Sequence, residues 1–469
     1  MMFRLIIVLC LLVMTLPILG QSDDDTIYDD PLFRFPIPQG WTDMSADGLA
    51  HFVNPEETVH LYVFAIADRT PNQLPAHLIP DFSGVSIQSN PVPLGMLTWT
   101  QDVYLLPSGE ILAVIYYVDD TGMTYVLAVQ GSPAVLGGVT SVLNEVLLGF
   151  VIKSVDTSVP PAPYDVPENY VEQDVSVITG RWQLGGTLLI PVGDGLFPAV
   201  VIVHGSGPND RDGTVNGVNK PYRDLAQGLA SNGVAVLRYD KRTFVYGSDY
   251  ADDMIMATMD EEVIDDALSA VALLRNIPNI DPNRIYVIGH SLGGMIAPEI
   301  ARRDGRLAGI ILMAGNSRSL VDVVLEQFDY LQTLPINANA DAQSLINRLR
   351  SEVQQIPSLT PDSDPNQMLF GVYATYWLDM MAYDQIATAQ NLDIPMLILQ
   401  GERDYQVTMT DFELWQSALA DKPNVTFISY PTLNHLFFAG EGQSTPTEYS
   451  LPSHIPIEVI TDIVNWMMQ

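Results

Sequence analysis

The pentapeptide GHSLG at residues 289–293 constrains the fold more than any other part of this chain. It follows the apolar run 285–288 directly, and residues 295–303 after it have the pattern of a helix. A turn this tight between a strand and a helix strains the backbone of its serine, and side chains two residues to either side would collide. We therefore predict that a strand ends and a helix begins at Ser291, with the hydroxyl raised above the edge of a sheet.

A serine hydroxyl at such a turn needs a histidine to take its proton and a carboxylate to orient that histidine. Chains that carry this turn supply the partners in the order serine, acid, histidine. Only two histidines follow Ser291, namely His435 and His454. We predict His435 as the base, because it follows the strand-like segment 425–430. His454 begins the last predicted helix and is the alternative base, with a capping or surface role as its simpler interpretation.

The acid is expected in the loop after the apolar segment 394–400, which reads as a buried strand. Asp404 lies in that loop, 31 residues before His435, and the interval has room for one helix and one strand. Glu402 is the alternative acid. Either carboxylate could instead be a solvated loop charge paired with Arg403.

The tetrahedral intermediate of acyl transfer requires two N–H donors for its oxyanion. We predict that one is the backbone amide of Leu292, directly after the serine. The second is predicted to be the amide of Ser206, in the loop that follows the strand-like segment 199–203. His204 in the same loop is expected to support it by hydrogen bonding rather than to transfer protons.

Five motifs occur in one order along the C-terminal two thirds of the chain. They are HGSGPNDRDG, PYRDLAQGLASNGVAVLRYDKR, GHSLGG, QGERDYQV and LNHLF. Over about residues 171–469 the chain resembles a bacterial family of α/β-hydrolase serine esterases with an extra N-terminal domain. The resemblance implies an α/β-hydrolase fold, a carboxylesterase activity on simple acyl esters, and Ser291, Asp404 and His435 as the triad.

At 469 residues the chain is too long for one core, and its patterns change along its length. Short strand-like segments separated by turns predict a small α+β domain over 21–153, and four prolines mark a linker over 154–169. From 170 to 469, apolar strands that alternate with helices predict a mostly parallel sheet covered on both faces. Residues 316–392 interrupt this alternation and are expected to form a helical cap with aromatic and methionine side chains.

The loops at 210–212 and 240–242 are predicted at the same sheet edge as Ser206. Their charges are expected to form ion pairs between the loops, and a site for a substrate carboxylate on Arg211 or Arg242 is the alternative.

The first 20 residues have the pattern of a secretory signal peptide: a short basic start, an apolar run over 5–16, and a small residue before a polar segment. We predict cleavage near Gly20 and a secreted or extracytoplasmic protein, with an uncleaved membrane anchor as the alternative. Cys10 is the sole cysteine and lies in the apolar run. The mature chain would then form no disulfide and no zinc–thiolate site.

A formal net charge of −35, from 21 basic and 56 acidic residues, would repel nucleic acid and anionic lipid. We expect a small acyl ester as the partner, no cofactor and no metal, and the oligomeric state stays open. The predicted function is a secreted serine carboxylesterase that works through an acyl-enzyme. A thioesterase, a serine aminopeptidase and a binding protein without catalysis are the alternatives.

Overall fold

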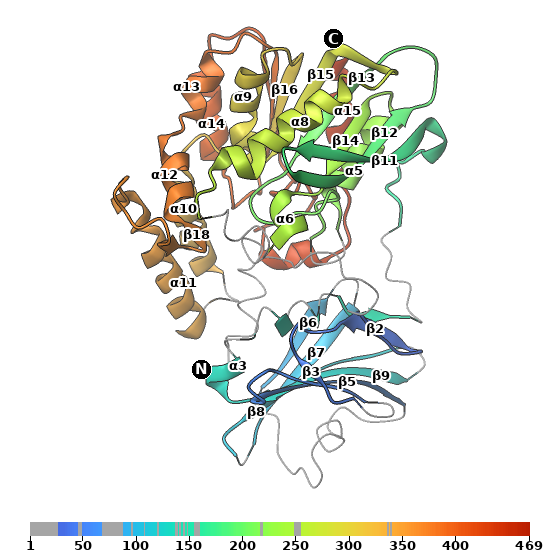
Figure 1. Ribbon diagram of the computed structural model, residues 1–469, viewed down its shortest axis with the longest axis vertical. Helices are drawn as coiled ribbons and strands as arrows, with labels where there is room; N and C mark the ends of the chain where they lie inside the picture. The colour runs from blue at the N-terminus through green and yellow to red at the C-terminus, as the bar shows by residue number, and fades with distance from the viewer. Residues whose placement is uncertain are drawn as a thin grey trace.

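The computed structural model describes the chain in segments. These are residues 27–45, 49–67, 88–94, 97–106, 108–119, 122–136, 139, 142–143, 146–147, 149–153, 160–215, 219–247, 255–334, 337 and 340–469. The predicted signal peptide, residues 1–20, lies outside the described residues. Of the predicted linker over 154–169, residues 154–159 also lie outside them. In Figure 1 the described residues form an antiparallel β region and, above it in the view, a larger α/β region.

The N-terminal region is built on an antiparallel sheet with the strand order β3-β4-β5-β9-β8-β7-β6. Its strands are β3 (Thr42–Asp43), β4 (Ala50–Val53), β5 (Val59–Ala67), β6 (Gln88–Leu94), β7 (Leu97–Leu105), β8 (Ile111–Val118) and β9 (Met123–Gly131). A smaller sheet holds β1 (Ile27–Asp29), β2 (Phe33–Pro36) and β10 (Val151–Ile152). The short helix α3 (Pro133–Leu136) and the buried Leu143 and Val146 cover one face, as expected for an α+β arrangement.

The C-terminal region is organised by an eight-stranded sheet with the order β11-β12-β14-β13-β15-β16-β19-β20. The strands are β11 (Tyr170–Thr179), β12 (Trp182–Pro191), β13 (Phe197–Val203), β14 (Ala235–Tyr239), β15 (Ile280–His290), β16 (Gly309–Met313), β19 (Met396–Gly401) and β20 (Val425–Tyr430). The first two pair antiparallel, and β14 to β20 run parallel. This is an α/β-hydrolase fold, as the sequence predicted.

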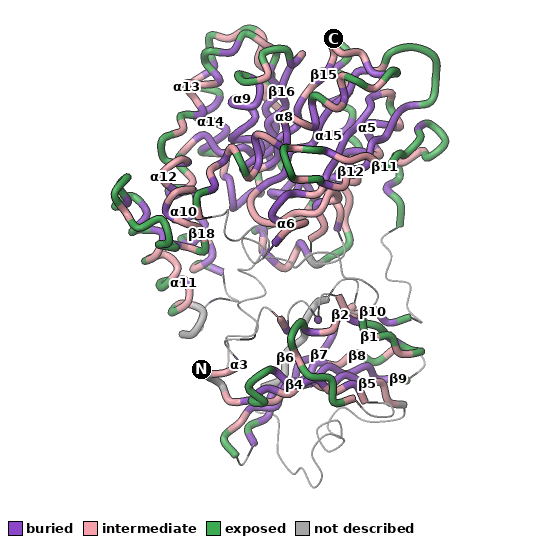
Figure 2. Tube along the Cα trace, viewed as in Figure 1, coloured by how far each residue is buried: buried purple, intermediate pink, exposed green. Residues whose placement is uncertain are grey.

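Every residue of β16 and β19 is buried, so helices must cover the sheet on both faces. Figure 2 shows the buried residues concentrated in this sheet and in the helices beside it. The helices are α5 (Pro221–Ser231), α6 (Arg242–Tyr246), the π-helical turn η6 (Asp260–Ile264), α8 (Asp265–Leu274), α9 (Leu292–Asp304), α14 (Met409–Ala418) and α15 (Ile457–Met467). Short 3-10 turns are η4 (Pro167–Asn169) and η9 (Pro446–Ser450). No helix in the described ranges is long and apolar enough to cross a membrane.

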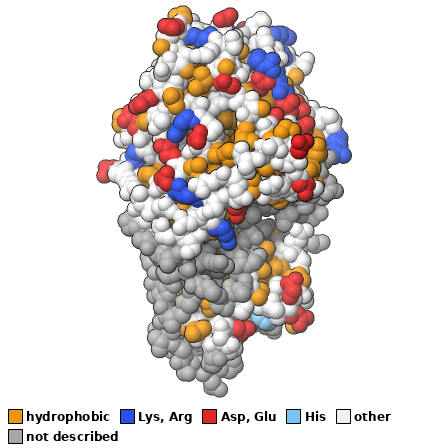
Figure 3. Space-filling model, turned by 90° about the vertical axis from the view of Figure 1, so that its left-hand side faces the viewer, with side chains coloured by type: hydrophobic (Ala, Val, Ile, Leu, Met, Phe, Trp, Pro, Cys, Tyr) orange, Lys and Arg blue, Asp and Glu red, His pale blue; other side chains and the backbone are white. Residues whose placement is uncertain are grey.

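Strands β16 and β19 are neighbours in the sheet, so the chain between them is an insertion. It contains α10 (Leu320–Thr333), α11 (Ala340–Val353), η8 (Ile356–Ser358), β17 (Met368–Leu369), β18 (Val372–Tyr373), α12 (Ala374–Ala382) and α13 (Gln385–Gln390). These elements lie along the left side of Figure 1. On that face hydrophobic side chains lie among scattered acidic and basic groups (Figure 3).

Candidate active site

Ser291 occupies the turn between β15 and α9, as the pentapeptide predicted. Its φ of 55° and ψ of −119° are unusual for a residue with a side chain, and its N–H donates to the Met313 carbonyl at 2.9 Å. The flanking glycines are required sterically. A Cβ on Gly289 would lie 2.1 Å from the Gly293 carbonyl oxygen, and a Cβ on Gly293 would lie 2.4 Å from that of Val203.

Asp404 and His435 are in direct contact at the carboxyl edge of the parallel sheet. His435 Nδ1 lies 2.7 Å from Asp404 Oδ2, and both residues are buried. Since an ionised carboxylate only accepts, Nδ1 carries the hydrogen, and Nε2 keeps a lone pair that can accept a proton. The Ser291 hydroxyl makes no direct hydrogen bond to His435 in the part of the chain that the structure describes.

The Asp404 carboxylate is oriented by three further donors. Its Oδ1 accepts the backbone N–H groups of Gln406 at 2.7 Å and Val407 at 3.0 Å, and its Oδ2 also accepts Gln400 Nε2 at 3.1 Å. These bonds fix both oxygens, so the oxygen that faces His435 cannot turn away.

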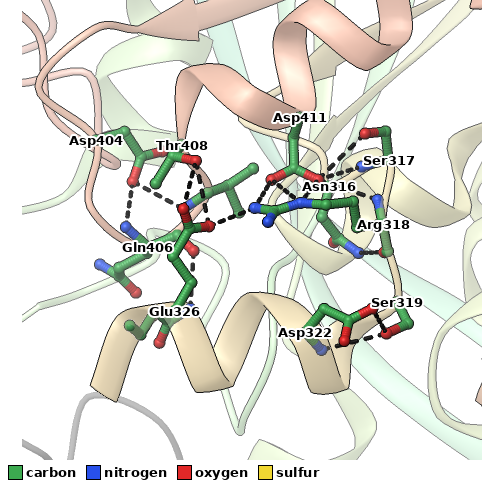
Figure 4. Close-up of polar contacts among 12 residues, drawn as sticks. Asn316, Ser317, Arg318, Ser319, Asp322, Glu326, Asp404, Gln406, Thr408 and Asp411 are labelled. Carbon is green, nitrogen blue, oxygen red and sulfur yellow. Dashed lines mark hydrogen bonds and ion pairs between the residues drawn. The ribbon is translucent and has the colours of Figure 1, made fainter. Parts of the chain in front are cut away.

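The loop that carries Asp404 is also connected to the insertion (Figure 4). The Gln327 amide on α10 donates to the Gln406 carbonyl at 2.9 Å. Arg318, just before α10, pairs with Glu326 and with the fully buried Asp411 on α14. The insertion therefore contacts the acid loop through a hydrogen bond, and it contacts α14, the helix after that loop, through an ion pair.

The alternative acid and base have other partners. His454 Nδ1 lies 3.0 Å from Asp224 Oδ2 on α5, and its Nε2 lies 2.8 Å from the Pro160 carbonyl oxygen. The hydrogen bond to Asp224 raises the pKa of His454. Glu402 is exposed and accepts a hydrogen bond from the Ser429 hydroxyl at 2.8 Å.

The loop after β13 passes directly beside Ser291. A Cβ on Gly205 would lie only 3.2 Å from the Ser291 Cβ. The Asn209 side-chain amide holds this loop through the carbonyls of Ser206 and Gly207, each at 3.0 Å. Leu292 is the first residue of α9, where a backbone N–H has no acceptor within the helix. Both predicted oxyanion donors therefore belong to segments next to the serine.

A buried chain of hydrogen bonds joins this loop to the backbone of His435. The Gly205 N–H donates to Tyr222 Oη at 3.1 Å, Tyr222 Oη lies 3.0 Å from His290 Nδ1, and His290 Nε2 lies 2.9 Å from the His435 carbonyl oxygen. An N–H can only donate and a carbonyl can only accept, so the hydrogen on each member of the chain is fixed. Burial lowers the pKa of His290 to about 3, in agreement with a neutral ring that carries its hydrogen on Nε2.

His204 is buried in the C-terminal α/β region, where its ring contacts the rings of Tyr222 and Tyr239 edge-on. Burial, together with the nearby positive charge of Lys241, lowers its pKa to about 3. Arg211 pairs with Asp240 at 2.6 Å, and Arg242 pairs with Asp266 at 2.6 Å. The first pair joins the two charged loops, and both guanidinium groups, the candidates for a substrate carboxylate, already hold a carboxylate.

Sequence reasoning missed four residues that support the site: Gln400, Asn209, Tyr222 and His290. Each lies inside or beside a motif that was recognised, but nothing in the motif says which backbone group its side chain contacts. Among the described residues, no group of three or more histidine, cysteine, aspartate or glutamate side chains is arranged to hold a metal ion.

Comparison with known proteins agrees with this architecture. The model of the Alpha/beta hydrolase family matches residues 200–448. Esterase EstD of Thermotoga maritima is 42% identical over 307 residues, which cover 65% of this chain and 69% of that protein. Quorum-quenching protein AidA of Acinetobacter baumannii is 28% identical over 154 residues, 33% of this chain and 44% of its own length.

Solved structures align with about two thirds of the chain. Est1E from Butyrivibrio proteoclasticus aligns with a TM-score of 0.41 at 15% identity, over 63% of this chain and 97% of that one. The Pyrococcus furiosus esterase Pf2001 aligns with a TM-score of 0.41 at 15% identity, over 64% and 91%. The match of the family model and the identity to the Thermotoga protein show that this chain belongs to the alpha/beta hydrolase family.

Proposed function

We propose that this chain is a carboxylic ester hydrolase in which Ser291 is the nucleophile, His435 the general base and Asp404 the residue that orients the base. The observation that carries the proposal is the buried 2.7 Å contact between His435 and Asp404, beside a serine held at a positive φ. The relative with 42% identity is named an esterase, and that name favours esters among the acyl substrates.

The reaction would proceed in two halves. His435 Nε2 takes the proton of Ser291 as the hydroxyl oxygen attacks the ester carbonyl, and the amides of Leu292 and Ser206 bind the oxyanion. His435 then gives that proton to the leaving alcohol, which departs from the acyl-enzyme. A water molecule, deprotonated by the same histidine, attacks the acyl group and releases the acid. In enzymes of this type, the hydrogen bond between serine and histidine often forms only once substrate is bound.

The assignment is tested by labelling the protein with a fluorophosphonate and mapping the modified peptide. We expect the label on Ser291, and no label and no hydrolysis of p-nitrophenyl esters in Ser291→Ala. Label on another residue, or full esterase activity in Ser291→Ala, would contradict the proposal. Activity on acyl-CoA or peptide anilides above that on p-nitrophenyl esters would favour a thioesterase or a peptidase instead, and a folded protein with no activity would favour a binding role.

The location of the protein is a separate proposal. The apolar run over 5–16 and the polar segment after Gly20 support secretion through a cleaved signal peptide. Expression of the full chain in a bacterium, followed by fractionation and N-terminal sequencing, tests it. A mature N-terminus close to residue 21 outside the cytoplasm is expected, and an intact N-terminus in the membrane fraction would support the anchor instead.

A further inference from the structure

Lys241 is an almost fully buried lysine that the triad does not explain. It follows β14 at the carboxyl edge of the sheet, and only 2% of its side chain is exposed. Its Nζ donates to the Gly205 carbonyl oxygen at 3.0 Å and pairs with Glu262 Oε1 at 2.7 Å. The sequence predicted ion pairs between the loop at 240–242 and the loop at 210–212. It did not predict that Lys241 contacts the backbone of the loop after β13.

The carbonyl that Lys241 holds belongs to the same peptide unit as the N–H of Ser206. A trans peptide is planar, so its C=O and its N–H point in opposite directions. A donor that fixes the Gly205 carbonyl therefore also fixes the direction in which the Ser206 N–H points. The neighbouring peptide is fixed as well, because the Gly205 N–H donates to Tyr222.

We propose that Lys241 is a positioning residue that aims the Ser206 N–H at the developing oxyanion, with Glu262 holding the ammonium group in place. This inference rests on the proposed function, because it assumes that the oxyanion forms at Ser291. A hydrogen bond to the carbonyl also polarises the peptide, which makes its N–H a stronger donor to an anion.

The surroundings of the pair favour this role over a purely structural one. Glu262 lies in the first turn of η6 and also accepts a hydrogen bond from Tyr376 on α12, so the carboxylate is held from two sides. A buried ion pair adds little net stability compared with apolar side chains of similar size. A buried ammonium group paired with a mostly buried carboxylate is therefore a poor way to join β14 to η6, whereas a charged donor is well suited to fixing the direction of one carbonyl.

The test compares Lys241→Met with the double variant Lys241→Met/Glu262→Gln. The single variant leaves a mostly buried carboxylate unpaired, so its thermal midpoint should fall. The double variant removes that charge, and its midpoint should return toward that of the wild type. In both variants kcat on p-nitrophenyl butyrate should fall by about 10- to 100-fold, with KM changed by no more than about threefold. This combination of recovered stability and lost kcat would not arise from a structural pair.

A trifluoromethyl ketone gives a second measurement, because its adduct with a serine carries the oxyanion. Its inhibition constant should rise in the double variant by about the same factor as kcat/KM falls. Lys422→Met is the matched control. Lys422 also donates to a backbone carbonyl, that of Leu392 at 2.5 Å, but it lies at the amino ends of β19 and β20, away from the site.

A folded double variant with kcat and ketone binding within about twofold of the wild type would overturn the positioning role. A wild-type protein that neither hydrolyses esters nor accepts the fluorophosphonate label would instead overturn the proposed function, and this inference with it. The two failures are therefore distinguishable in the same set of measurements.

Discussion

Tyr222→Phe removes one oxygen atom from the middle of the buried chain that joins the loop after β13 to His435. The hydroxyl accepts from the Gly205 N–H and donates to His290 Nδ1. Its loss leaves two buried polar groups without a partner, and each costs about 1–3 kcal/mol. We therefore expect a loss of about 2–6 kcal/mol in the free energy of unfolding, the sum of these two costs.

Tyr170→Phe is the control, because it removes a tyrosine hydroxyl in the same α/β region whose hydrogen bond is only partly buried. Tyr170 Oη donates to Asp165 at 2.8 Å, and Asp165 is partly exposed, so water can replace the lost donor. We expect a cost of about 1 kcal/mol or less for this change. Urea denaturation of both variants, followed by tryptophan fluorescence, gives the comparison.

The same substitution should remove the hydrogen bond to His290 Nδ1 without changing which ring nitrogen carries the hydrogen. In the wild type the fixed ends of the chain select the neutral form with hydrogen on Nε2, and burial keeps the pKa near 3. Nitrogen-15 NMR of the imidazole should therefore show one neutral form from about pH 5 to 9. Tyr222→Phe should keep that form, because the His435 carbonyl still accepts from Nε2, but the Nδ1 resonance should shift because that nitrogen loses its hydrogen-bond donor. Equal stability of the two tyrosine variants together with an unchanged His290 spectrum would refute the reasoning.

Three further outcomes follow from the geometry. Asp404→Asn should reduce kcat by about 10,000-fold in a p-nitrophenyl ester assay, because the base loses its orientation, while Glu402→Gln should leave it unchanged. Gly293→Ala places a Cβ 2.4 Å from a carbonyl oxygen of β13 and should lower the free energy of unfolding by about 3 kcal/mol or more. Gly305→Ala, at a φ of 67° with open space around it, should lower it by only about 1–2 kcal/mol in the same urea denaturation assay. The carboxylate partner of His454 raises its pKa above 6.5, so its contribution to stability is complete below that pH and is lost as the pH rises through the folded-state pKa. The difference in thermal midpoint between wild type and His454→Ala should therefore be larger near pH 6 than near pH 9.

Much of the α/β architecture could be predicted because its strands are continuous apolar runs. Segment 199–203 lies in β13, and segment 394–400 overlaps β19. The residues at which strands begin and end were predicted less accurately. The run 285–288 belongs to β15, which begins earlier at Ile280 because it also pairs with Phe197 of β13. The strand order, with β13 between β14 and β15, is a property of pairing that local pattern does not encode.

The candidate site, like the fold, could be predicted from the sequence only in part. Ser291, Asp404 and His435 could be predicted as neighbours because each follows a strand of the parallel sheet, and the carboxyl ends of parallel strands meet at one edge. Tyr222 and His290 were missed because their role depends on which atoms face each other. Tyr222 lies near the start of a helix, far along the chain from either of its partners, and no spacing rule predicts that contact.

The parallel sheet therefore determines where the chemistry can occur, but a second set of groups determines how well the atoms align. Sheet topology brings the loop after β13 and the loop after β20 to one edge. Topology alone still allows small shifts of these loops. Such shifts matter because a misplacement of about 1 Å can reduce the rate by about 100-fold. In this chain the two loops are tied by Tyr222 and His290, and the first is also held by Asn209 and Lys241. Because each of these connections ends on a backbone N–H or C=O, replacing any other side chain of the two loops would leave them intact. A change in any of the four supporting residues would move the loops.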